Sequence, residues 1–163
     1  AGLGLGALPK PAALLRLHVG ARGRRFRAGA RASAWLPREA AAPGHPEVGG
    51  RFWLVSGGVY GCGVLRPGKR VEFPLCGALD VGVLGGRGVG ELMPARAARS
   101  PWLGLSAGPG VHVAVTRRLA VQAALEGLAV LARPRFEISG LGAPCCGQVV
   151  GGQLTAGLAV TLP

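Results

Sequence analysis

The stretch Gln153-Leu-Thr-Ala-Gly-Leu-Ala-Val-Thr-Leu162 has an apolar side chain at every second position. The positions between them carry Gln, Thr, Gly and Ala. Because successive side chains of a β-strand point to opposite faces, this pattern predicts a strand with one apolar face and one small or polar face. Similar alternation recurs along the whole chain. It predicts eight strands, at about residues 1–8, 12–22, 25–36, 52–65, 71–85, 101–116, 119–137 and 149–162.

One of these segments is ambiguous on its own. In residues 119–131, Gln122 and Glu126 share a face at a period of two, but they also share a face of a helix. Alanine and leucine in this segment favour the helix. Because both neighbouring segments are strand-like, we expect a strand here as well.

The connections between the expected strands differ in length. Short turns at one end of a barrel, long loops at the other and an even number of strands are typical of outer-membrane proteins. We therefore predict an all-β fold, a single domain over residues 1–163 that forms an eight-stranded antiparallel up-and-down transmembrane β-barrel. The expected short turns are residues 22–24, 66–70 and 116–118, the expected long loops are 37–51, 86–100 and 138–148, and the connection 9–11 is a short exception among the long ones.

The composition combines high hydrophobicity with a strong positive charge. Hydrophobic residues make up 49% of the chain, yet it contains 19 basic and only 7 acidic residues, which gives a formal charge of +12. Abundant Arg and a single Ile indicate a GC-rich genome, and a spurious translation of such DNA is one alternative. The regular alternation argues against it. Nucleic acid is not an expected partner, because the basic residues divide between the two ends of the barrel and no aromatic platform accompanies them.

Between the two rims of the expected barrel, the charges within the strands all fall on the face that we assign to the lumen. An arginine or lysine that faces lipid at mid-membrane costs about 2–4 kcal/mol, so a charge-free outer face is expected of a membrane barrel. An eight-stranded barrel is too narrow for a channel, and side chains fill it. We interpret the inward charges as an internal network that plugs the lumen, with a gated pore as the alternative. Its predicted members are Arg16, Arg25, Arg27, Arg31, Glu72, Asp80 and Glu126.

A second set of arginines falls at the long-loop end. Their expected partners are anionic lipid head groups or the phosphates of lipopolysaccharide. The predicted rim contacts are Arg38, Arg51, Arg96, Arg99, Arg133 and Arg135.

The four cysteines form two different pairs. Cys62 and Cys76 have the same parity, so both face inward, and a turn centred on Lys69 places them directly opposite each other. That separation is within disulfide range, and an exported protein meets an oxidising compartment, so we predict a disulfide, with two buried thiols as the alternative. For the adjacent Cys145 and Cys146, a vicinal disulfide, an intermolecular bridge and free thiols all stay open.

Catalytic and metal-binding patterns are weak. Ser106 and His112 lie six residues apart on one expected strand, about 20 Å, which is too far for a nucleophile and its base. His18 and His112 could share a metal, but hydrogen-bonded lumen histidines are the commoner case. The glycine-rich residues 86–90 lack the spacing of a phosphate loop. We therefore predict no enzyme activity, no cofactor and no metal.

Several short segments carry a resemblance to known proteins. Residues 8–163 resemble a loosely defined myxobacterial-type group of outer-membrane barrels of unknown function, and the layout is similar to small barrels of the OmpA/OmpX type. The resemblance implies the fold and the membrane, but no activity. The segments that carry it are Trp35-Leu-Pro37, the Cys62 to Cys76 hairpin, Gly85-Gly-Arg-Gly-Val-Gly90, Ser100-Pro-Trp102 and Gly157-Leu-Ala-Val-Thr-Leu-Pro163.

These observations lead to one expected function and two alternatives. We expect a monomeric barrel of the bacterial outer membrane, of structural or surface-interaction type, whose partners are membrane lipid, lipopolysaccharide and the barrel-assembly machinery. The first alternative is a soluble lipocalin-like carrier, which would need an apolar cavity. The second is a lipid-modifying membrane enzyme, which would need a cluster of Ser, His and acidic residues at the outer rim.

Overall fold

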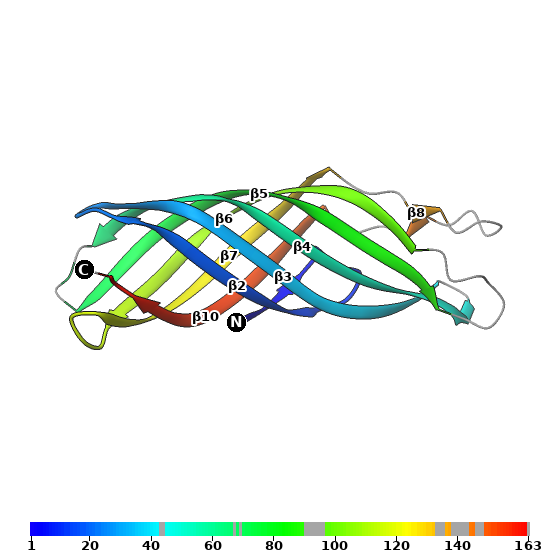
Figure 1. Cartoon of the computed structure of the whole chain (residues 1–163), viewed down its shortest axis with the longest axis horizontal. Helices are drawn as coiled ribbons and strands as arrows, with labels where there is room; N and C mark the ends of the chain where they lie inside the picture. Colours follow the sequence, from blue (N-terminus) through cyan, green and yellow to red (C-terminus); the bar gives the residue numbers. More distant parts are fainter. Residues whose placement is uncertain are drawn as a thin grey trace.

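A computed structural model describes residues 1–42, 45–66, 68, 70–89, 97–132, 136–137, 144–145 and 149–162. Its strands form an elongated barrel whose long axis is horizontal in Figure 1. The strands are β1 (Gly2–Leu5), β2 (Ala12–Arg22), β3 (Phe26–Ala42), β4 (His45–Arg66), β5 (Val71–Val89), β6 (Ala97–Ala114), β7 (Leu119–Ala132), β8 (Phe136–Glu137), β9 (Pro144–Cys145) and β10 (Val150–Val160).

Eight of these strands close into one antiparallel barrel. Their order is β1-β10-β7-β6-β5-β4-β3-β2, so each barrel strand pairs with the next barrel strand along the chain, and β1 closes the ring with β10. The short strands β8 and β9 pair only with each other. The prediction of an all-β, eight-stranded antiparallel barrel is confirmed, and so is the strand at residues 119–131. The part of the chain that the structure describes has no helix long and apolar enough to cross a membrane.

The prediction of long loops at residues 37–51 and 86–100 is wrong. β3 continues to Ala42, β4 begins at His45, and β4 pairs with β5 as far as Gly49 and Val89. A register shift between Trp35 and Arg38 accommodates Pro37, which has no N–H to give to the ladder. Beyond this bulge, glycines are poor strand formers, but pairing with the neighbouring strands continues. We call this part of β3 to β6, residues 38–42, 45–52, 85–89 and 97–101, the sheet extension.

The sheet extension projects from the end of the barrel that lies opposite the short turns (Figure 1).

The first strand is shorter than expected. β1 ends at Leu5, and Gly6 adopts a φ of 88°, which only glycine does without strain. The turn therefore folds back toward the lumen, and Ala7 and Leu8 are buried there.

The sequence predicts a polar, arginine-rich lumen, and the structure shows that only part of the lumen is polar. Toward the sheet extension, inward-facing residues pack into a hydrophobic cluster. Each of its two tryptophans lies over a glycine: Trp35 over Gly4, and Trp102 over Gly104. A Cβ at either glycine would lie within 2.4 Å of the indole ring, so these positions need glycine. The cluster consists of Ala7, Leu8, Ala12, Leu14, Trp35, Phe52, Leu54, Leu84, Trp102, Leu128 and Val130.

The outer face of the barrel is apolar and exposed. Exposed Leu and Val side chains occur on every strand of the barrel from β1 to β7 and on β10. Monomeric soluble proteins rarely expose a continuous apolar surface of this kind. Examples from successive strands are Leu3, Leu17, Val59, Val81, Leu105, Leu125 and Leu154.

Candidate functional site: the polar part of the lumen

Arg31 occupies the centre of the polar lumen. It lies on β3 opposite Gly58 of β4, which in turn lies opposite Asp80 of β5. Because Gly58 has no side chain, the Arg31 guanidinium reaches across it, and Nε donates to Asp80 Oδ1 at 2.8 Å. A second nitrogen, Nη2, pairs with the other carboxylate oxygen of Asp80 and also donates to Ser106 Oγ at 2.8 Å. A Cβ at position 58 would lie 2.7 Å from Asp80 Oδ1, so a larger residue there would obstruct this bidentate pair.

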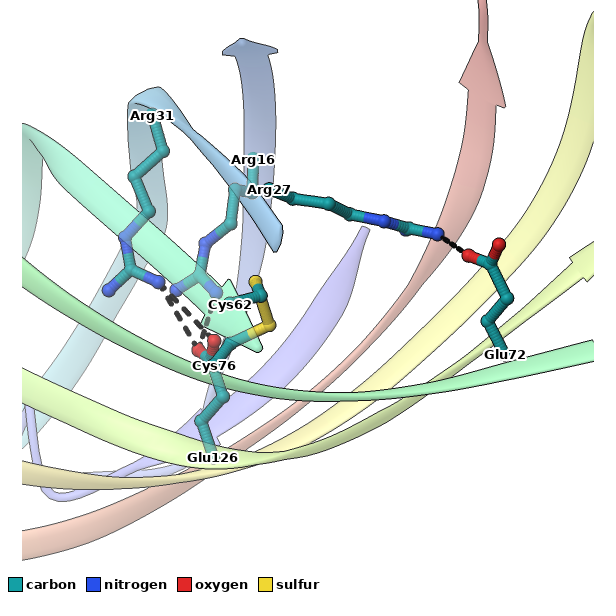
Figure 2. Close-up of a disulfide and its surroundings, with 7 residues drawn as sticks. All are labelled: Arg16, Arg27, Arg31, Cys62, Glu72, Cys76 and Glu126. Carbon is teal, nitrogen blue, oxygen red and sulfur yellow. Dashed lines mark hydrogen bonds and ion pairs between the residues drawn. A yellow bond between two sulfur atoms is a disulfide. The ribbon is translucent and has the colours of Figure 1, made fainter. Parts of the chain in front are cut away.

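Glu126 on β7 joins Arg31 to a second arginine. Its carboxylate accepts a hydrogen bond from Arg16 Nη1 at 2.7 Å and one from Arg31 Nη1 at 3.3 Å. Figure 2 shows both guanidinium groups pointing from β2 and β3 toward this carboxylate. Arg16 also donates to Ser33 and Gln153, and Gln153 donates back to Glu126. Two arginines and two carboxylates thus form one buried network without net charge, which is the condition under which buried charges are tolerated.

A second ionic cluster lies nearer the short-turn end of the lumen. Glu72 on β5 pairs with Arg27 of β3 and accepts a hydrogen bond from Arg22 of β2 at 2.6 Å. His112 lies opposite Glu72 in the ladder, with its Nδ1 3.9 Å from the carboxylate. The Arg22 side chain is 44% exposed, whereas that of Arg27 is 13% exposed. The second ionic cluster therefore extends from a buried arginine to a partly exposed one at the short-turn end of the barrel.

A disulfide joins Cys62 and Cys76 on the lumen side of the β4–β5 hairpin. The two residues are direct partners in the ladder, with Cα atoms 4.0 Å apart, as the turn centred on Lys69 predicts. Arg27 of the second ionic cluster lies directly opposite Cys62 in the ladder between β3 and β4. Of the other two cysteines, Cys145 is in β9, and Cys146 lies outside the described residues.

Removal of this disulfide is expected to lower the free energy of unfolding by roughly 2 kcal/mol. The bond closes a short loop in the unfolded chain, and the adjacent hairpin ladder limits the entropy that is released when the bond is absent. The measurement is urea unfolding of the Cys62→Ala/Cys76→Ala variant, which keeps Cys145 and Cys146. Reductant should destabilise the native protein to the level of this variant and leave the variant unchanged. Equal unfolding midpoints for the oxidised protein and the variant would contradict this expectation.

The remaining polar side chains of the lumen have separate partners. Ser106 contacts Arg31, while His112 approaches Glu72, so the two do not form a nucleophile and its base. The His18 ring stacks on Tyr60 with ring centroids 4.9 Å apart. Among the described residues, no group of three or more His, Cys, Asp or Glu side chains is arranged to hold a metal ion.

Six of the seven predicted lumen residues are brought together as two ionic clusters. Arg25 is the exception, because β3 begins one residue later and Arg25 is exposed in the preceding turn. Sequence reasoning did not assign the partners Ser33, Ser106 and Gln153 or the space left by Gly58. All four lie on the inward face, so parity could have identified them as neighbours of the arginines.

The predicted rim arginines fall into two groups. Arg38, Arg51 and Arg99 are exposed in the sheet extension, and Arg51 Nη2 lies 3.1 Å from Glu39 Oε1. Arg38 lies opposite Phe52, which faces the lumen side, whereas Arg51 and Arg99 point outward by their register. Arg96, Arg133 and Arg135 lie outside the described residues.

Comparison of the chain with protein-family models, with curated proteins and with solved structures found no match.

Proposed function

We propose that this protein is a monomeric β-barrel of a bacterial outer membrane, with a structural or surface-interaction role and a plugged lumen. The observation that carries the proposal is the apolar outer face, with exposed Leu and Val on all eight barrel strands. Among the barrel residues whose side chains the structure describes, outward-facing charges within the strands occur only on the sheet extension. A lipid bilayer would cover this apolar outer face. A charged residue that faces the middle of the bilayer costs free energy, which explains where the outward-facing charges lie.

The interior supports the same proposal. A soluble carrier would need an empty apolar cavity, but the apolar part of this lumen is filled by packed side chains such as Leu14 and Leu54, which are fully buried. The polar part is filled by neutralised ion pairs. A filled lumen favours a structural role or recognition by the exposed ends. Insertion into the membrane would depend on the barrel-assembly machinery, in line with the resemblance to small outer-membrane barrels.

The test is folding of the purified, urea-unfolded protein into phosphatidylcholine vesicles and, in parallel, into plain buffer. We expect a strand-rich circular dichroism spectrum and a heat-modifiable band on a gel only when lipid is present. A strand-rich monomer that is stable in plain buffer would overturn the proposal in favour of the soluble carrier.

A further inference from the structure

The outward-facing charges of the sheet extension lie side by side on neighbouring strands. Arg51 on β4 is the direct ladder partner of Glu39 on β3 and of Arg87 on β5. Arg99 on β6 lies opposite Gly85, two residues from Arg87 along β5. Direct partners in an antiparallel pair have their side chains on the same face, so all four point outward. We call Arg51, Arg87 and Arg99 the arginine row.

Among the side chains that the structure describes, the arginine row carries more positive charge than its neighbours neutralise. Arg51 and Arg87 are opposite each other, and like charges in that position destabilise a sheet. The carboxylate of Glu39 contacts only Arg51, and both side chains are about 60% exposed. Among the side chains that the structure describes, no carboxylate lies within salt-bridge distance of Arg87 or Arg99. A bound anion would therefore offset the repulsion between the ladder partners Arg51 and Arg87.

Trp53 marks the boundary between the arginine row and the apolar outer face of the barrel. Its indole lies over Gly85 on the outer face, where a Cβ would be 2.2 Å from the ring. Two residues from Trp53, away from the arginine row, the outward positions are Val55 on β4 and Val83 on β5, both exposed. Along the strands, which rise about 3.3 Å per residue, only a few residues separate the arginines from a surface that is purely apolar. Tryptophan and arginine in this position are typical of a membrane–water interface.

We propose that the arginine row binds the phosphate group of an anionic lipid, whose acyl chains lie along the apolar outer face of β4 and β5. This inference rests on the proposed membrane location and names a ligand for one part of the rim. Guanidinium groups suit this ligand, because each can give two parallel hydrogen bonds to phosphate oxygens. The row offers such groups from three neighbouring strands of a rigid sheet, beside apolar surface that accepts the rest of the lipid.

The test uses the folded protein in uncharged detergent micelles and two lipids that differ only in the phosphate, dioleoyl phosphatidic acid and dioleoylglycerol. Bound lipid is counted by native mass spectrometry. For the variant Arg51→Gln/Arg87→Gln/Arg99→Gln, we expect the Kd for phosphatidic acid to rise by about tenfold or more. Binding of dioleoylglycerol should be the same in the variant and the native protein.

The matched control is Arg24→Gln/Arg117→Gln/Arg118→Gln, which removes the same charge from exposed turns at the other end of the barrel. Its Kd should change by less than about twofold, since these arginines do not form a row across strands. An equal loss of affinity in both triple variants would overturn the site. Competition by inorganic phosphate as effective as that by the lipid, at the same phosphate concentration, would overturn the assignment to a lipid.

The outcomes separate this inference from the proposed function. Native protein that folds into micelles and vesicles, but binds phosphatidic acid no more tightly than the arginine-row variant, would overturn the lipid site and leave the membrane barrel in place. Native protein that folds only in plain buffer would overturn the proposed function and the lipid ligand with it. Because the three arginines are exposed, the variant should fold like the native protein, which the heat-modifiable band checks directly.

Discussion

Replacement of Arg31 by alanine is expected to lower the free energy of unfolding by about 3–5 kcal/mol, because it leaves buried carboxylates without their cation. Asp80 loses both hydrogen bonds from the Arg31 guanidinium, and no other described cation contacts it. Glu126 loses one partner but keeps Arg16 and Gln153. The effect should therefore come mainly from Asp80. The measurement is urea unfolding of the barrel in phosphatidylcholine vesicles.

The matched control for this prediction is Arg22→Ala, which also removes an arginine from an inward ion pair. Arg22 is partly exposed, and Glu72 keeps Arg27, so the expected loss is below about 1 kcal/mol. Adding Asp80→Ala to Arg31→Ala should cost less than Asp80→Ala costs in the native protein, since the removed pair is coupled. Equal losses for Arg31→Ala and Arg22→Ala would contradict a central role for Arg31.

The alternation of the sequence was enough to predict the barrel and the faces of its strands. Parity assigned Arg16, Arg27 and Arg31 to the lumen, and the symmetry of one hairpin gave the register of Cys62 and Cys76. Parity is informative here because a shift by one residue would move every charge to the opposite face. It does not tell which inward residues meet, since that depends on the registers of non-consecutive strands.

The contact between Arg31 and Asp80 illustrates this limit. The two residues are on strands separated by β4, and they meet only because Gly58 stands between them. Nothing local to any one strand contains this information. The same holds for Trp35 of the hydrophobic cluster, which lies over Gly4 of β1, whereas Trp102 lies over Gly104 of its own strand.

The ends of the strands were predicted least well. Residues 37–51 and 86–100 contain Pro, Gly and Arg, which indicate loops by propensity. In the structure, the backbones of β3 to β6 pair beyond the rim, and pairing with a neighbour outweighs the weak preference of each residue. This difference matters for function, because a paired sheet holds Arg51 and Arg87 in fixed register, whereas a loop would not.

The alternating sequence places charged side chains inside the barrel and apolar side chains on its outer face. Inside, charged groups are buried but are paired so that the central network has no net charge. Outside, apolar groups are exposed on every strand, which water does not favour and lipid does. A position on the outer face therefore responds to substitution in a way that depends on what surrounds the barrel.

Val81→Arg tests that dependence directly. Val81 lies on the outer face of β5, within the barrel, and is 60% exposed. In a bilayer, an arginine there should lower the free energy of unfolding by about 2–4 kcal/mol, because its charge would face the hydrocarbon core. In water, a substitution at so exposed a site should change stability by no more than about 0.5 kcal/mol.

The control for depth is Val115→Arg. Val115 has the same residue type and the same 60% exposure, but it follows β6 at the short-turn end, where an arginine should cost only about 0–1 kcal/mol. Both variants are unfolded with urea in phosphatidylcholine vesicles beside the native protein. A large loss for Val81→Arg with a small loss for Val115→Arg is the signature of a barrel that spans the bilayer, since the two valines are equally exposed but lie at different depths. Equal small losses at both sites would mean that the outer face of β5 meets water, and the membrane location would have to be abandoned.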